Sequence, residues 1–269
     1  MTRNLTRLAG LCSLAVILPV SPALAGPPPE LAAALQYLRE QHSYSWEVIN
    51  GDPGPVEQDI ETARGPIKTV IHNASPHLKG RLSASGEMLI ERDWPDGLTL
   101  QTLVAADGAQ VTNTPAGWLS QREILEAIAA ERLRPDGPSA SGPWLPLAEA
   151  VNTRRPAEEL EPFLDPRAEF EKSGETYICT IPIMAEGPAA VRDESQAIGR
   201  VIVSLHVVGG VLRDYELKRE IARYVTRAKI PIVANSDQIV ILSYLPVGRI
   251  DVPEEARAKL KPGRGNPRG

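Results

Sequence analysis

The stretch from Gly199 to Leu217 reads Gly-Arg-Val-Ile-Val-Ser-Leu-His-Val-Val-Gly-Gly-Val-Leu-Arg-Asp-Tyr-Glu-Leu. Two runs rich in β-branched residues meet at a glycine pair, which is typical of a β-hairpin. A two-residue loop of Gly209 and Gly210 would place the apolar row of the first strand opposite charged side chains of the second. We therefore predict a three-residue loop, Val208 to Gly210, with Gly210 in the left-handed conformation.

The predicted loop gives the hairpin one apolar face, because apolar side chains of both strands then lie opposite one another. Its cost is that Leu205 faces Arg213, whose aliphatic stem can lie along the apolar row. The predicted pairs are Val201 with Leu217, Val203 with Tyr215 and Val207 with Val211.

The first 25 residues have the three parts of a secretory signal peptide. Arg3 and Arg7 supply positive charge, an apolar run extends from Leu8 to Val20, and Ala23-Leu24-Ala25 is a cleavage motif. This apolar run is too short for a membrane-spanning helix, which needs about 20 residues. We predict cleavage after Ala25 and export to the periplasm or the exterior.

The charge of the mature chain argues against a nucleic-acid-binding protein, and its cysteine content argues against a disulfide-stabilised fold. Without Arg3 and Arg7, the 29 basic residues become 27 against 34 acidic residues, a net charge of −7. Nucleic acid is therefore not an expected partner. Cys179 is the one cysteine after residue 25, so no internal disulfide can form. We expect a single β-rich domain over residues 26–262 and a flexible basic tail over 263–269.

The remaining elements follow from periodicity and turn residues. A capping box joins Ser120 to Glu123 at the start of one helix. Pro182 places its strand near a sheet edge, and residues 51–66 are expected to form a long loop. The predicted helices cover residues 30–41, 121–132, short turns within 135–166 and a last segment after Pro253; the predicted strands cover 44–48, 67–72, 88–93, 98–105, 110–113, 168–172, 176–184 and 238–247.

The last predicted strand, Gln238 to Val247, is apolar on both faces, which indicates cover on both sides. One face carries Ile239, Ile241 and Leu245, and the other carries Val240, Leu242 and Tyr244.

These elements predict an α+β fold, a strongly curved antiparallel β-sheet (half-barrel) with an N-terminal helix and a mid-chain helical insertion. This order resembles the lipoprotein-localisation (LolA/LolB-like) superfamily. The segments Ser-Tyr-Ser-Trp (43–46), Gly-Trp-Leu-Ser-Gln-Arg-Glu (117–123) and Val-Pro-Glu-Glu-Ala (252–256) also resemble segments of uncharacterised exported bacterial proteins. The superfamily resemblance implies a concave sheet that holds acyl chains, with helices as a lid.

The candidate site residues are apolar or aromatic. Tryptophans 46, 94 and 118 either line a ligand groove or anchor the core, since aromatic side chains serve both purposes. We expect a groove under the helix that starts at Ser120 and under the proline-rich segment after it. The candidate ligand-binding residues are Trp46, Trp118, Val240, Leu242 and Tyr244.

No catalytic, metal or cofactor site is predicted. The spacing of His72 and His77 fits no common set of metal ligands. Cys179 lies between Tyr177 and Ile181 on one strand face, which favours a buried thiol over a nucleophile. Nucleophile-elbow, phosphate-loop and dinucleotide motifs are missing from the sequence.

The resulting hypothesis is an exported, non-enzymatic domain that binds or carries a lipid or other apolar molecule. The alternative is a structural or interaction protein of the cell envelope with a filled core, and a hydrolase ranks third. Contact with a membrane would be transient if it occurs. The sequence leaves the oligomeric state open.

Mass analysis of the exported protein should find Gly26 as the first residue, because signal peptidase cleaves after Ala-Leu-Ala. Material from an envelope fraction that still begins with Met1 would contradict export by this signal.

Overall fold

The structure, a computed structural model, describes residues 26–51, 56–62, 65–71, 75–132, 144–164, 168–184, 197–225 and 231–260. The predicted signal peptide and basic tail lie outside these residues. His72 does as well.

Most strands join one antiparallel sheet. Its members are β1 (Tyr44–Asn50), β4 (His77–Leu82), β5 (Met88–Asp93), β6 (Thr99–Val104), β7 (Gln110–Thr114), β8 (Gly117–Ser120), β9 (Glu171–Ser173), β10 (Thr176–Met184), β11 (Ala197–Val208), β12 (Val211–Val225) and β13 (Pro231–Ser243). The order across these 11 strands is β8-β7-β6-β5-β4-β1-β13-β12-β11-β10-β9. Strands β2 (Val56–Thr62) and β3 (Gly65–Ile71) form a separate two-stranded sheet.

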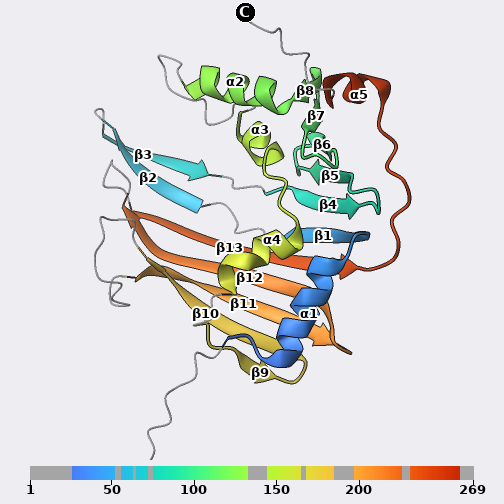
Figure 1. Cartoon of the computed structure of the whole chain (residues 1–269). Helices are drawn as coiled ribbons and strands as arrows, with labels where there is room; N and C mark the ends of the chain where they lie inside the picture. Colours follow the sequence, from blue (N-terminus) through green and yellow to red (C-terminus); the bar gives the residue numbers. More distant parts are fainter. Residues whose placement is uncertain are drawn as a thin grey trace, which may run out of the picture.

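Helices pack on both faces of the large sheet, which confirms the α+β class. They are α1 (Pro29–Glu40), α2 (Gln121–Arg132), α3 (Trp144–Ala150), α4 (Pro156–Leu160), the 3-10 turn η1 (Glu161–Phe163) and α5 (Glu254–Leu260). Helices α1, α3 and α4 lie on one face, which we call the inner face, whereas α5 packs on the opposite, outer face beside β7 and β8 (Figure 1). No helix in the described ranges has the length and apolarity needed to cross a membrane.

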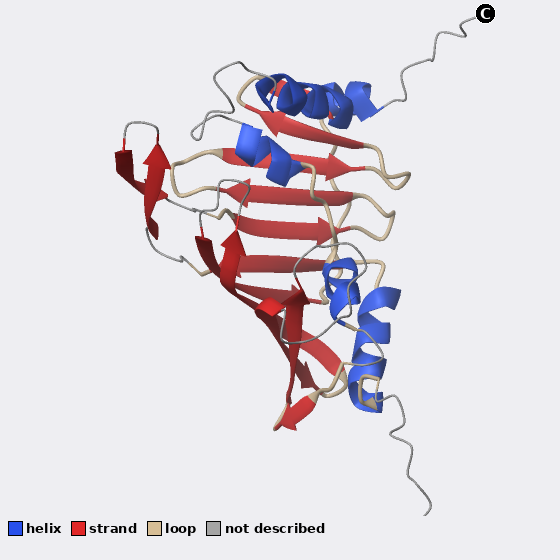
Figure 2. Ribbon diagram, turned by 90° about the vertical axis from the view of Figure 1, so that its left-hand side faces the viewer, coloured by secondary structure: helices blue, strands red, loops and turns tan. Residues whose placement is uncertain are grey.

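The strand direction changes strongly along the sheet. In Figure 1, β10 to β13 run across the view and β4 to β8 are foreshortened. Figure 2, turned by 90°, shows the strands below α2 at full length and those beside α1 foreshortened. Neighbouring strands are rotated in one sense by the steric twist of L-residues, and the rotation accumulates over many strands.

The hairpin that organises the fold has a two-residue loop, so the predicted three-residue loop is wrong. Val208 pairs with Val211, and Gly209 and Gly210 have φ of 60° and 77°. Positive φ at both central residues is the type I′ pattern, whose twist matches that of the flanking strands.

A β-bulge in β12 contains the extra unpaired residue that we had predicted in the loop. The register shifts between His206 and Val207, and Arg213 is left without a cross-strand partner. Beyond the bulge, Val203 pairs with Leu217 and Leu205 with Tyr215. Away from the turn the predicted buried rows are therefore correct and the predicted partners are displaced by two residues. Beside the turn, Val207 pairs with the buried Leu212 instead of the predicted Val211.

Strand β13 is covered on one face, which corrects the prediction of cover on both. Val240 and Leu242 are at most 5% exposed, whereas Ile239 and Ile241 are 41% and 43% exposed. Leu245, 76% exposed, follows the end of the strand. The described helices over β13 and its neighbours lie on the inner face, so the outer row meets solvent.

Three strands are missing from the prediction or misassigned. The loop expected over residues 51–66 contains β2, whose register sets Val56 opposite Ile71 and Ile60 opposite Ile67. The loop prediction is therefore wrong for Val56–Thr62. His77 begins β4, and the meander continues into β8 before α2 begins.

Helix α2 begins at the predicted capping box. The Ser120 amide and hydroxyl both donate to Glu123 Oε2 at 2.8 Å, and the Glu123 amide donates to Ser120 Oγ at 3.4 Å. Lys259 of α5 donates to the same carboxylate at 2.5 Å. Hydrogen bonds from Lys259 and then Ser120 lower the pKa of Glu123 to about 2.

Replacing the cap hydroxyl should destabilise the chain. Ser120→Ala is expected to cost about 1 kcal/mol of unfolding free energy, because it removes an acceptor for a helix amide. Urea denaturation measures the loss, and Ser120→Thr, which keeps the hydroxyl, is the control. Equal stability of Ser120→Ala and wild type would show that this cap contributes nothing.

Candidate functional site

Four of the five candidate ligand-binding residues lie together on the inner face. Trp46 pairs with Leu242 and Val48 with Val240 across the junction of β1 and β13. Trp46, Val240 and Leu242 are at most 5% exposed. Tyr244 packs against the same cluster and donates a hydrogen bond to the Leu212 carbonyl at 2.8 Å.

Trp46 is positioned by a glycine on the neighbouring strand. Gly80 is its partner on β4, and a Cβ at Gly80 would lie 2.0 Å from Trp46 Cε2. The indole therefore occupies the space where a side chain of β4 would otherwise stand.

Trp118 lies apart from the other four candidates. It belongs to β8 and packs against an outer-face cluster that contains Leu103, Val111, Ile250 and Ala256. Trp118 and Trp46 therefore lie on opposite faces of the sheet, and β4 to β7 separate their strands.

The inner apolar cluster continues along the sheet. Its sheet residues come from β1, β4, β5, β10, β11, β12 and β13, and helix α1 adds a row of buried side chains. The α1 row is Leu31, Ala34, Leu35 and Leu38. Most of the lining is aliphatic, with buried rings at Tyr44, Trp46, Tyr177 and Tyr215.

The proline-rich segment covers part of this cluster through α4 and η1. Leu160 is fully buried, and Phe163 and Leu164 pack against the cluster. Helix α2, the other predicted cover, packs on α3, β7 and β8 instead.

A partly buried carboxylate contact joins α4 to the sheet. Tyr215 Oη donates to Glu159 Oε2 at 2.6 Å, and Gln238 Nε2 donates to Glu159 Oε1 at 2.9 Å. Burial, with the nearby Glu159 charge, raises the pKa of Tyr215 well above its usual value. The phenol therefore stays protonated and continues to donate.

A cavity of about 190 Å³ lies between the end of α1 and the α4–η1 segment. Tyr44, the first residue of β1, belongs both to its lining and to the buried cluster. The lining residues are Leu38, Arg39, Gln41, Tyr44, Arg155, Ala157, Glu158 and Glu161.

A polar group under α3, which our sequence reasoning did not find, ends the apolar tract. Arg92 is 2% exposed and donates to Thr102 Oγ1 at 3.2 Å and to the Asn152 carbonyl at 2.5 Å. Thr102 lies 3.1 Å from the Thr112 hydroxyl and donates to the Ala150 carbonyl at 3.3 Å. The signal was available, because Arg92 shares the buried face of its strand with Met88 and Ile90.

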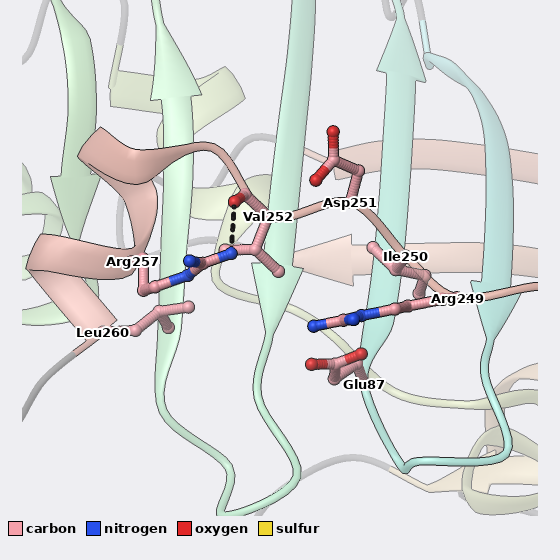
Figure 3. Close-up of a pocket in the computed structure, with 7 residues that line it drawn as sticks. All are labelled: Glu87, Arg249, Ile250, Asp251, Val252, Arg257 and Leu260. Carbon is pink, nitrogen blue, oxygen red and sulfur yellow. Dashed lines mark hydrogen bonds between the residues drawn. The ribbon is translucent and has the colours of Figure 1, made fainter.

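A second cavity, of about 160 Å³, lies on the outer face beside α5. Figure 3 shows the guanidinium groups of Arg249 and Arg257 extending toward it from two sides, with the Glu87 carboxylate beside Arg249. Arg257 Nη2 donates to the Val252 carbonyl at 3.2 Å. The lining is completed by Ile250, Asp251, Val252 and Leu260.

The histidine and cysteine candidates have other partners. His77 Nε2 lies 2.8 Å from Glu47 Oε1. Cys179 is 2% exposed, which confirms the buried thiol, and burial raises its pKa. Within the described ranges, no three His, Cys, Asp or Glu side chains are arranged to hold a metal ion.

Comparison with known proteins gives no family. No protein-family model matches the chain, and no curated protein matches it.

Gly80→Ala should destabilise the protein by about 1–3 kcal/mol, because the added methyl group overpacks against the Trp46 ring. Urea denaturation gives the free energy of unfolding. Gly248→Ala is the matched control, since a Cβ there meets no atom within 4 Å. Equal losses for the two variants would contradict the Trp46 contact.

Proposed function

We propose that the chain is an exported, non-enzymatic domain that binds or carries a lipid or another apolar molecule on its inner face. In this proposal the change of strand direction curves the sheet into a half-barrel, as in the LolA/LolB-like superfamily that the sequence resembles. The observation that carries it is an apolar inner face, from β10 to β5, covered by short separate helices.

The cover supports the proposal because it can be displaced in parts. Helix α4 has five residues and η1 three, too few to be stable alone, so they depend on tertiary contacts. The Glu159 hydrogen bonds to Tyr215 and Gln238 are worth about 1.5–3 kcal/mol each for a charged acceptor. Opening this cover would expose the inner cluster.

The lining suits a flexible hydrocarbon chain. Aliphatic side chains dominate it, and each Å² of apolar surface removed from water contributes about 25 cal/mol. The cavity that reaches Tyr44 between α1 and α4 offers an entry point. Export would place such a domain in an envelope where acyl chains need shielding from water.

A non-enzymatic role agrees with the state of the one cysteine after residue 25. The Cys179 thiol is buried and its pKa is raised, which disfavours the nucleophilic thiolate.

An interaction protein of the cell envelope is the second candidate. Ile49, Ile239 and Ile241 form an exposed apolar group on the outer face, each 41–44% exposed, and Ile49 pairs with Ile239. A partner that covers these side chains would account for their exposure.

Displacement of an environment-sensitive fluorescent fatty acid from the delipidated mature protein tests the first proposal. Leu242→Asp should weaken binding at least about tenfold, because it puts a charge on the apolar inner face. Ile241→Asp is the matched control: its side chain is the next on β13, points to the outer face, and should leave binding unchanged.

A photoreactive fatty acid keeps the test decisive if Leu242→Asp fails to fold. Crosslinks assigned to single inner-face residues such as Tyr44 and Val240 are expected in the wild-type protein. Absence of saturable binding, or labelling confined to the outer face around Ile241, would reject the inner-face site and favour the interaction protein.

A further inference from the structure

The outer-face cavity beside α5 combines two signs of charge with an apolar floor. Its wall carries two guanidinium groups, from Arg249 and Arg257, and two carboxylates, from Glu87 and Asp251. Its floor is formed by Ile250, Val252 and Leu260, which belong to or pack against the outer apolar cluster. The cavity volume is about 160 Å³.

The four charged groups of the wall form no close ion pairs. In the part of the chain that the structure describes, none of them has an ion-pair partner within 4.0 Å. Arg257 uses one nitrogen on the Val252 carbonyl, and Glu87 accepts a hydrogen bond from Ser85. Arg249 extends its guanidinium toward the cavity (Figure 3).

From this arrangement we propose that the cavity binds a small zwitterion, with an ammonium group a few atoms from an acidic oxygen group. The guanidinium groups of Arg249 and Arg257 donate paired hydrogen bonds to the carboxylate or phosphate oxygens. The carboxylate of Glu87, which lies beside Arg249, accepts from the ammonium group. An apolar side chain of the ligand contacts the floor.

Two sources share this chemistry: a free α-amino acid with an aliphatic side chain and a phosphoethanolamine headgroup. The apolar floor fits the first, because Ile250, Val252 and Leu260 give a headgroup nothing to contact beyond its charges. The site lies on the other face of the sheet from the proposed lipid site, so the two proposals fail independently.

Calorimetric titration of the mature protein tests the site with L-leucine and two analogues that each lack one charge. These are 4-methylpentanoate, without the ammonium group, and 3-methylbutylamine, without the carboxylate. Leucine should bind saturably and at least about tenfold more tightly than either analogue, since each lost charge leaves its partners unpaired. O-phosphoethanolamine is the fourth ligand, and tighter binding of it than of leucine assigns the site to a headgroup.

Three variants test the residues. Arg249→Gln should weaken leucine binding at least about tenfold, and Arg213→Gln, at the bulge of β12, should not change it. Glu87→Gln should weaken leucine and strengthen 4-methylpentanoate, because it removes an acceptor for the ammonium group and a charge that repels the carboxylate. The proposal is overturned if neither zwitterion binds, if 4-methylpentanoate binds wild type as tightly as leucine, or if Arg249→Gln binds leucine normally.

Discussion

The pairing of β1 with both β4 and β13 holds the large sheet together. On one side of β1 lie β4 to β8, consecutive in the chain, and on the other lie β13 to β9 in reverse order. Without β1 these two meanders would share no strand ladder within the described ranges. Trp46 fixes the junction, because its ring fills the space over Gly80 while its strand partner on the other side is Leu242. The inner apolar face is continuous for the same reason.

In the β11–β12 hairpin away from the turn, local alternation was sufficient to predict which side chains are buried, and it was insufficient to predict their partners. Val203, Tyr215 and Leu217 are buried as their spacing indicates. Their register depended on an unpaired residue, which a loop or a bulge can supply with the same parity. The structure has the bulge and not the longer loop, because a type I′ turn at the two glycines matches the twist of the strands.

The sites depended on contacts that no local pattern contains. Trp46 and Trp118 both adjoin strands, yet they face opposite sides of the sheet, and only the full strand order reveals this. The outer cavity joins Glu87, just before β5, to residues more than 160 positions later that return along the sheet. Arg92 could have been found from a local pattern, because the alternation of its own strand places it on the buried face.

The filled state of the inner face determines how a ligand there would behave. A hydrocarbon chain entering the cluster replaces side chains such as Leu160, which are already buried. It therefore gains the difference between two sets of apolar contacts, less the hydrogen bonds broken at Glu159. Its apparent affinity falls further by the fraction of molecules whose cover is open. Such a site would release its ligand when α4 and η1 return to the sheet, so it suits transient carriage better than storage.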